Sequence, residues 1–329
     1  MHAVAEARAN IALVKYWGKA DPELNLPAVP SLSITLAGLT TRTSVRFDPS
    51  LRRDWVRLDG READSRTVER VSRHLDRVVS ESGARALFAE VEGHNDFPTA
   101  AGLASSASGF AALTLAAAAA AGRELDRSAL SVLARRASGS AARSLFGGLV
   151  VLDRGAAGDP WSSVARPAGE HADWNDLRLV IGVVSEQAKS TSSTSGMTRS
   201  EESPYYPAWV ASATRDVNEA LDAIAHRRID ALGEITERSA LRMHACAMSA
   251  DPGVVYLRGP TIEGLHAIRE LRRSGVAAWF TCDAGPHPKA LTNDRDAGAV
   301  ARALASVPGV QRVLTLSPGA GAELVEARQ

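Results

Sequence analysis

The stretch Pro98-Thr-Ala-Ala-Gly102-Leu-Ala-Ser105-Ser106-Ala-Ser108 stands directly before an alanine-rich run that ends near Ala121. Pro98 and Gly102 favour a loop, and the small side chains around them leave its backbone unobstructed. The alanine-rich run predicts a helix, and the first turn of a helix carries unpaired N–H groups that bind anions. Serine hydroxyls at that turn can reach a phosphate or a bound magnesium ion. The stretch therefore predicts a phosphate site, although a serine-capped helix packed through its alanines gives the same pattern.

The composition excludes several classes of protein. The 38 Lys and Arg residues equal the 38 Asp and Glu residues, so the basic surplus typical of nucleic-acid binders is missing. The two cysteines, Cys246 and Cys282, have no metal-ligand spacing, which predicts a cytoplasmic protein without a disulfide framework. The most apolar run, residues 110–121, is shorter than the roughly 20 residues that span a bilayer. We therefore expect a small-molecule substrate and neither a nucleic-acid nor a membrane partner.

Apolar runs and helical spacings alternate along the 329 residues, which predicts an α+β fold in two domains. Residues 154–176 are rich in Gly, Pro, Ala and Asp, so we expect one domain at 1–176 and another at 177–329. In the first domain, strands are predicted at 3–7, 11–14, 31–36, 43–47, 87–91 and 149–152, and helices at 68–81, up to 121 and at 128–137. In the second, strands are predicted at 177–184, 277–281 and 310–316, and helices at 209–226, 229–248, 261–273 and 296–305.

Two lysines near the N-terminus, Lys15 and Lys19, flank the aromatic pair Tyr16-Trp17. In a strand, Lys15, Trp17 and Lys19 would share one face and Tyr16 would point to the other. Two cations and a phenol can hold a diphosphate, whereas a half-exposed strand with solvated lysines has the same spacing.

A second candidate segment, Ser138-Gly-Ser140-Ala-Ala-Arg143, offers two hydroxyls beside one guanidinium. Arginine binds planar oxyanions through two parallel hydrogen bonds, which suits a carboxylate or a phosphate. Arginine more often lies solvated at the surface, and we expect that position for Arg135 and Arg136.

Asp283 follows a predicted apolar strand and opens a tight Asp-Ala-Gly-Pro turn. Aspartate at such a place is most often a turn or cap residue, but its carboxylate can also take the proton of an attacking hydroxyl. His244 and Cys246 have no second ligand pair at zinc spacing, so we interpret them as a helix residue and a buried thiol.

Together these segments resemble one branch of the GHMP kinase superfamily, the diphosphomevalonate decarboxylases. The resemblance is carried, in family order, by residues 10–19, 98–113, 138–148 and 281–286, and it extends to 192–197 and the Met243-His244 pair. It implies a GHMP-kinase-like fold with an N-terminal domain like ribosomal protein S5 and a C-terminal ferredoxin-like α/β sandwich. It also implies a homodimer that uses ATP and Mg²⁺ to decarboxylate mevalonate 5-diphosphate to isopentenyl diphosphate.

The resemblance implies a role for each candidate residue. Asp283 is the expected acid/base, Lys15 the cation near the reacting hydroxyl, and Arg143 the group that orients the substrate carboxylate. The other substrate contacts are expected at Asn10, Tyr16, Lys19, Ser138, Ser140 and Ser193. The nucleotide contacts are expected at Pro98, Gly102, Leu103, Ala104, Ser105, Ser106 and Ser108, with Ser105 and Ser106 also facing the metal.

Several positions depart from the family pattern and bear on the choice of substrate. Val29-Pro30-Ser31 stands where many relatives carry Asn-Ser-Ser, and Ala142 stands where cysteine is common. His287 replaces the usual asparagine, and Thr194 stands where some relatives direct an arginine toward the diphosphate. A decarboxylase for mevalonate 5-phosphate therefore remains an alternative, as do a kinase for a sugar or amino alcohol and a GHMP-like nucleotide-binding module without catalysis.

Overall fold

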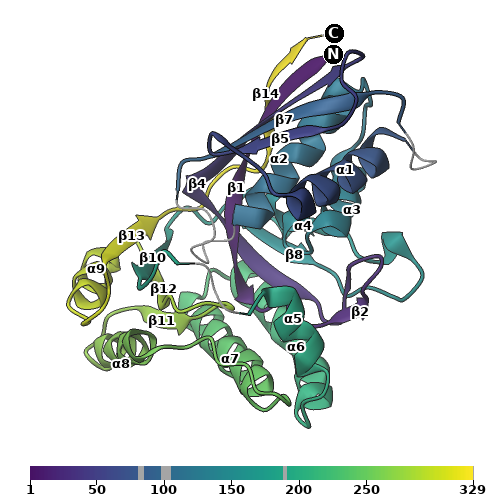
Figure 1. Ribbon diagram of the computed structural model, residues 1–329. Helices are drawn as coiled ribbons and strands as arrows, with labels where there is room; N and C mark the ends of the chain where they lie inside the picture. Colours follow the sequence, from purple (N-terminus) through teal and green to yellow (C-terminus); the bar gives the residue numbers. More distant parts are fainter. Residues whose placement is uncertain (81–84, 98–104, 188–190, 329) are drawn as a thin grey trace.

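The computed structural model describes residues 1–80, 85–97, 105–187 and 191–328 and arranges them in two halves (Figure 1). The first half contains an eight-stranded sheet with helices against one face, and the second contains a four-stranded antiparallel sheet with helices on both faces. The α+β class expected from the sequence is confirmed. Among the described residues, no helix combines the length and the apolar character needed to cross a bilayer.

The first sheet has the strand order β14-β1-β4-β7-β5-β6, and β8 and β9 extend it from β4. Its strands are β1 (His2–Val14), β4 (Ser31–Asp48), β5 (Trp55–Leu58), β6 (Arg61–Glu62), β7 (Phe88–Asn95), β8 (Leu149–Leu152), β9 (Ala165–Pro167) and β14 (Glu323–Arg328). A short ribbon pairs β2 (Lys19–Asp21) with β3 (Leu26–Pro27). The helices of this half are α1 (Ser65–Val79), α2 (Ser105–Ala120), α3 (Arg127–Ala137) and α4 (Ala141–Ser144), with a 3₁₀ turn η1 (Pro160–Ser162).

The alanine-rich helix α2 is the centre of the first core. Small residues such as Ala3, Ala5 and Ala7 of β1 face it, so helix and sheet approach closely without large rings. Carboxylates begin its two neighbours: the side chain of Asp64 accepts the N–H of Thr67 in α1, and that of Asp126 accepts the N–H of Ala129 in α3.

The second half contains the sheet β11-β12-β10-β13 and five helices. Its strands are β10 (Leu177–Val183), β11 (Ala278–Thr281), β12 (Lys289–Asn293) and β13 (Arg312–Leu316). Its helices are α5 (Ser193–Ser200), α6 (Tyr206–Ala225), α7 (Ile229–Met248), α8 (Gly259–Arg273) and α9 (Ala297–Ala305).

Strand β10 shows why this sheet is covered on both sides. Leu179 and Ile181 belong to the core that includes α6 and α7, whereas Val180 belongs to the core under α8 and α9. Successive side chains of a strand point to opposite faces. The buried, charge-free run from Leu179 to Val183 therefore requires a helix layer on each face.

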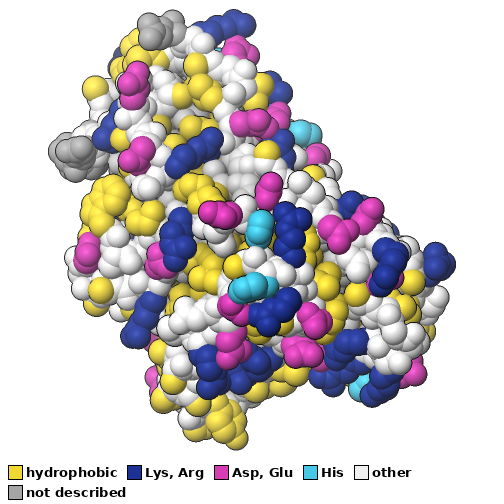
Figure 2. Space-filling model, turned by 180° about the vertical axis from the view of Figure 1, so that it is seen from behind, with side chains coloured by type: hydrophobic (Ala, Val, Ile, Leu, Met, Phe, Trp, Pro, Cys, Tyr) yellow, Lys and Arg dark blue, Asp and Glu magenta, His cyan; other side chains and the backbone are white. Residues whose placement is uncertain are grey.

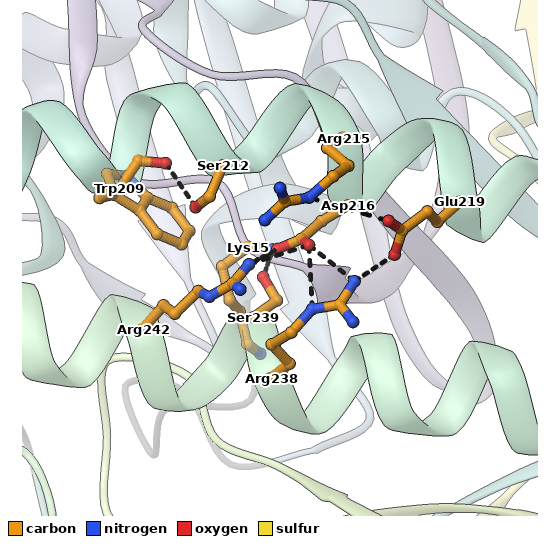
Figure 3. A network of polar contacts seen from close by, with 9 residues as sticks. All are labelled: Lys15, Trp209, Ser212, Arg215, Asp216, Glu219, Arg238, Ser239 and Arg242. Carbon is orange, nitrogen blue, oxygen red and sulfur yellow. Dashed lines mark hydrogen bonds and ion pairs between the residues drawn. The ribbon is translucent and has the colours of Figure 1, made fainter.

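Helices α6 and α7 are joined by a buried carboxylate (Figure 3). Asp216 of α6 is fully buried and accepts hydrogen bonds from Arg238 and Arg242 of α7. The residue after Arg238, Ser239 of α7, faces the end of β1, where its Oγ accepts the backbone N–H of Lys15 over 3.0 Å. The ion-paired helices thus hold a hydroxyl against the residue that follows β1.

One core runs through the junction of the two halves. It joins Leu13 of β1 and Ile34 of β4 to Leu179 of β10 and Ile224 of α6. The end of β1 is therefore packed against the C-terminal half. The last strand, β14, pairs with β1, so residues 323–328 belong to the first sheet although they lie inside the range expected for the second domain. Elsewhere the boundary near residue 176 stays a prediction.

Candidate active site

The site lies where β1 ends. Lys15 directly follows β1 and is 1% exposed. Its Nζ donates to the carbonyl of Ala12 over 2.7 Å and lies 2.6 Å from Oδ1 of Asp283. The cation of the first half and the carboxylate of the second, predicted from motifs more than 260 residues apart, are thus in direct contact.

Asp283 lies in the turn between β11 and β12, and its side chain keeps 26% of its surface exposed. Its second oxygen, Oδ2, lies 3.2 Å from Nζ of Lys289, the first residue of β12. Sequence reasoning missed Lys289, because a single lysine in a short apolar run carries no motif. The structure therefore places two ammonium groups on one carboxylate.

The charges around this contact shift the pKa values of both Asp283 and Lys15. Burial alone would raise the pKa of Asp283, but Lys15 and then Lys289 outweigh it and hold that pKa well below its usual range. Burial, reinforced by Lys289 and opposed by Asp283, lowers the pKa of Lys15. The carboxylate is therefore ionised at neutral pH, beside a lysine that holds its proton less firmly than a solvated one.

Arg143 is held in place by two side chains. It lies in α4, is 2% exposed, and donates from Nη1 to Ser31 Oγ over 2.7 Å and from Nε to Asn10 Oδ1 over 3.3 Å. Asn10 in turn donates to Ser144 Oγ and to the carbonyl of Ser140. Burial lowers the pKa of Arg143 to about 10, although Tyr16 and Asp283 oppose the shift.

This arrangement refines two expectations. Asn10 has both ends of its amide occupied by the protein, so its position suits the orientation of Arg143 better than direct contact with a substrate. Ser31, in the segment where the family pattern is altered, still supplies a hydroxyl to the guanidinium.

Tyr16 lies beside the Ser138–Ser140 segment. A Cβ at Gly139 would collide with its hydroxyl, so only glycine allows this approach. Arg143 stands 5.8 Å from the centre of the Tyr16 ring, and Ser138 and Ser140 are half-buried with their hydroxyls 3.4 Å apart. The hydroxyl of Tyr16 is buried and has no hydrogen-bond partner among the described residues. A buried donor without a partner is costly, which fits a bound anion at this position.

Lys19 begins β2 and is half-buried. Burial lowers its pKa, and Arg70 of α1 lowers it further while Glu201 opposes the shift. Arg70 lies against the ring of Phe110 and donates to the carbonyl of Ala137, the residue before Ser138. Sequence reasoning missed Arg70 because it belongs to the arginine-rich face of an ordinary helix. Its place beside Lys19 adds a cation close to the serine segment.

The start of α2 is described only in part. Pro98, Gly102, Leu103 and Ala104 lie outside the described residues. Ser105 and Ser106 form the first turn of α2 and keep some exposure, which fits a nucleotide phosphate. Ser108 is fully buried and shares a hydrogen bond of 2.6 Å with Thr41, so its hydroxyl faces the sheet and is a poor candidate for a nucleotide contact.

The described residues contain no group of three or more His, Cys, Asp or Glu that could hold a metal ion. The first turn of α2 likewise carries hydroxyls and no carboxylate. Such a donor set fits magnesium that arrives with nucleotide phosphates. Ser193 is the first residue of α5 and is half-buried, and its contact with substrate stays a prediction.

Two expectations are wrong. Residues 15–19 do not form one strand, because Gly18 has φ +100° and β1 and β2 are separate; Lys15 and Lys19 therefore point to different places. Arg135 is not at the surface: it is fully buried and donates to the carbonyls of Ser163 and Pro160. Its guanidinium donates to two loop carbonyls that take no part in strand pairing.

His244 is a buried residue of α7, as expected, but it lies within the field of the Asp283 cluster. Burial, and after it the charge of Lys15, lowers its pKa to about 4. Its ring is therefore neutral at physiological pH.

Comparison with known proteins assigns the fold and the motifs to one family. Residues 7–165 match the family model of the diphosphomevalonate decarboxylase-like N-terminal domain. Residues 179–319 match that of the mevalonate 5-diphosphate decarboxylase C-terminal domain. The chain belongs to the diphosphomevalonate decarboxylase family.

Relatives within this family match most of the chain. The diphosphomevalonate decarboxylase of Ganoderma lucidum is 37% identical over 306 residues, covering 87% of this chain and 76% of its own. The enzyme of that name from Homo sapiens is 35% identical over 316 residues, covering 88% and 76%.

Solved structures of decarboxylases have the same architecture. The complex of MDDEF with MVAPP, AMPPCP and magnesium superposes with a TM-score of 0.93 at 36% identity and covers 99% of both chains. Mevalonate diphosphate decarboxylase from Staphylococcus aureus gives a TM-score of 0.92 at 34% identity and covers 99% of this chain and 98% of its own. The two-domain fold implied by the resemblance is confirmed.

Proposed function

We propose that the protein catalyses the ATP-dependent decarboxylation of mevalonate 5-diphosphate to isopentenyl diphosphate, with release of ADP, phosphate and CO₂. The observation that carries this proposal is the contact between Lys15 and Asp283 at the junction of the two halves, with Arg143 held nearby. This arrangement supplies a base, a cation and a carboxylate-binding fork in one place.

In the first step the oxygen of the C3 hydroxyl attacks the terminal phosphorus of ATP, and ADP leaves. Asp283 accepts the proton of that hydroxyl. A carboxylate with a lowered pKa is a weak base, so we expect the proton to move late, after the new P–O bond has begun to form. Lys15 can then turn to the transferring phosphoryl group and offset its charge.

In the second step the tertiary phosphate leaves from C3 with its bonding electron pair. The electrons of the C1–C2 bond form the new C2–C3 double bond, and C1 departs as CO₂. Arg143, locked by Ser31 and Asn10, orients the carboxylate so that the breaking bond is aligned with the leaving phosphate.

The neighbouring cations Lys19 and Arg70 favour the diphosphate over the monophosphate. Lys19 and Arg70 lie close enough for Arg70 to lower the pKa of Lys19. The buried hydroxyl of Tyr16 has no hydrogen-bond partner among the described residues and can donate to a phosphate oxygen. A terminal phosphate would offset the repulsion between these cations. Arg70 thereby supplies a charge that Thr194 does not.

We further propose that ATP binds with its phosphates at the first turn of α2, near Ser105 and Ser106. The magnesium ion that accompanies ATP would neutralise charge on its phosphates during transfer. A homodimer and a cytoplasmic location stay predictions from the resemblance and the composition. Basic and acidic side chains are interspersed on the face shown in Figure 2, in keeping with their equal numbers in the sequence.

The test is a substrate panel. The purified protein is incubated with Mg-ATP and, in turn, mevalonate, mevalonate 5-phosphate and mevalonate 5-diphosphate, and CO₂, ADP and the organic product are measured by mass. We expect CO₂ and isopentenyl diphosphate from the 5-diphosphate only. Product from the 5-phosphate alone would reassign the substrate, ADP without CO₂ would indicate a kinase, and no turnover would indicate a binding module.

A further inference from the structure

The chain uses lysine sparingly. Of its 38 basic residues only four are lysines, at positions 15, 19, 189 and 289, and the rest are arginines. Lys189 lies outside the described residues. Of the remaining three, Lys15 and Lys289 are each 1% exposed and both contact Asp283. Because ordinary surface cations are arginines in this chain, a buried lysine marks a place where a compact ammonium is required.

Lys289 belongs to the scaffold of the C-terminal half. It is the first residue of β12, paired with Thr281 of β11 on one side and Ile181 of β10 on the other. Its Nζ lies 3.2 Å from Asp283 Oδ2 and 3.5 Å from the carbonyl of His287. Among the residues that the structure describes, Asp283 is the only carboxylate in ion-pair contact with Lys289.

A second ammonium at this carboxylate is not explained by stability. One lysine is sufficient to balance the charge of Asp283, and each further buried cation costs several kcal/mol of desolvation. The cluster of Lys15, Lys289 and Asp283 carries one excess positive charge, which a purely structural ion pair would avoid. The two lysines also belong to different halves of the fold. Lys15 follows β1 of the first half, and Lys289 begins β12 in the C-terminal half that also carries Asp283.

We propose that Lys289 is a positioning residue for Asp283: it holds Oδ2 within the C-terminal half, so that Oδ1 stays directed at the substrate hydroxyl when Lys15 turns to the phosphoryl group. This inference rests on the proposed function. A carboxylate bound by Lys15 alone would be free to rotate as soon as that contact breaks. With Lys289 in place, the base keeps its orientation until it has accepted the proton of the hydroxyl.

Other titratable groups near Asp283 do not replace this contact. Arg143 of α4 feels the charge of Asp283 but donates to Ser31 and Asn10. His244 of α7 is neutral because burial lowers its pKa to about 4, and burial raises the pKa of the Cys282 thiol to about 11. Once Lys15 has turned away, Lys289 is the remaining cation in ion-pair contact with Asp283 within the described part of the chain.

The test is the Lys289→Met variant of the full chain, which shortens the unbranched side chain by one atom and removes its charge. We expect kcat to fall roughly 100-fold while KM for mevalonate 5-diphosphate and for ATP stays within about threefold, since positioning acts on the transition state. The acid limb of the kcat profile should move to higher pH, because Asp283 loses one of its two cations. The melting temperature should not fall, because the remaining Lys15–Asp283 pair is electrically balanced.

Thr292→Val is the matched control on the same strand. Thr292 is fully buried, but its hydroxyl donates to the carbonyl of Ala277 at the far end of β12. We expect this control to lower the melting temperature and to leave kcat and its pH profile unchanged.

The outcomes separate the possible failures. No CO₂ from the wild-type protein would overturn the proposed function itself. Active wild type together with an unchanged kcat and pH profile in Lys289→Met would overturn the role of Lys289 alone. A rise in KM as large as the loss in kcat, or a lowered melting temperature with loss of kcat in both variants, would also overturn it in favour of a binding or packing role.

Discussion

Two aspartates of this protein are each held by two cations, and they differ in what the cations leave free. Asp216 is fully buried between α6 and α7, where Arg238 and Arg242 donate four hydrogen bonds to it (Figure 3). Asp283 is bound by two lysines, one at each oxygen, and its side chain remains 26% exposed. The guanidinium groups occupy both oxygens of Asp216, which full burial keeps from any other partner. The two ammonium groups leave lone pairs of the partly exposed Asp283 for a substrate.

The comparison shows that burial and paired charge do not by themselves mark a catalytic carboxylate. Asp216 joins two helices of the same half, and the packing it secures places Ser239 under the backbone of Lys15. Asp283 instead lies at the junction, where groups from both halves converge. Substitution of Asp283 should therefore lower kcat, whereas substitution of Asp216 should lower the free energy of unfolding.

The largest expected effect is that of Asp283→Asn. This variant keeps the shape of the side chain and removes the base, so kcat should fall by roughly 10³-fold or more. Binding of an ATP analogue, measured by calorimetry, should stay within a few-fold of wild type. A variant that turns over at a near-normal rate would show that Asp283 is as structural as Asp216.

Arg143→Lys should reduce kcat/KM for mevalonate 5-diphosphate by roughly 100-fold. A lysine keeps the charge but cannot donate to Ser31 and Asn10 and still present a planar fork to the carboxylate. The measurement is steady-state kinetics with both substrates varied. Arg135→Lys is the control, since Arg135 is equally buried but donates to loop carbonyls; equal losses in the two variants would contradict a specific role for Arg143.

Asp216→Asn should act on stability and leave the chemistry intact. Loss of the carboxylate removes charged hydrogen bonds to two arginines that are about one-third exposed, so we expect a cost of about 2 kcal/mol in the free energy of unfolding. Urea titration measures this cost. At a temperature where the variant is folded, kcat should lie within about threefold of wild type, and a loss as large as that of Asp283→Asn would erase the distinction between the two sites.

The smallest effect concerns His244, which adjoins the Asp283 cluster. Burial, followed by Lys15, lowers its pKa to about 4. Between that value and the unfolded value near 6.5, the unfolded chain binds a proton that the folded protein does not. Stability from this residue is therefore complete above about pH 6.5 and is lost as the pH falls below it.

At pH 5.5 the loss amounts to about 1 kcal/mol relative to pH 7.5. His244→Gln cannot titrate, so the wild type should lose about that much more free energy of unfolding than the variant over this pH interval. Urea titrations at the two pH values make the comparison. Parallel losses in both proteins would mean that His244 is protonated in the folded state.

Much of the fold could be predicted from local patterns. The strand at 149–152 and the helix at 229–248 have the predicted bounds, because each is a contiguous apolar or amphipathic run. The predicted runs at 3–7 and 11–14 merge into β1, and those at 31–36 and 43–47 merge into β4, since long-range pairing carries a strand through polar residues. Strand β14 was missed for the same reason: its residues are mostly exposed, and pairing with β1 is what makes it a strand.

The sequence by itself determined the family motifs, the prediction of a phosphate site at the start of α2 and the choice of Lys15, Arg143 and Asp283 as candidates. These are properties of residue types and short spacings, which depend on local chemistry. Only the tertiary structure decided that Lys15 and Asp283 touch, that Lys289 shares the same carboxylate, and that Arg135 is buried. Contacts of this kind join segments far apart in the chain, and the packing of the two halves creates them.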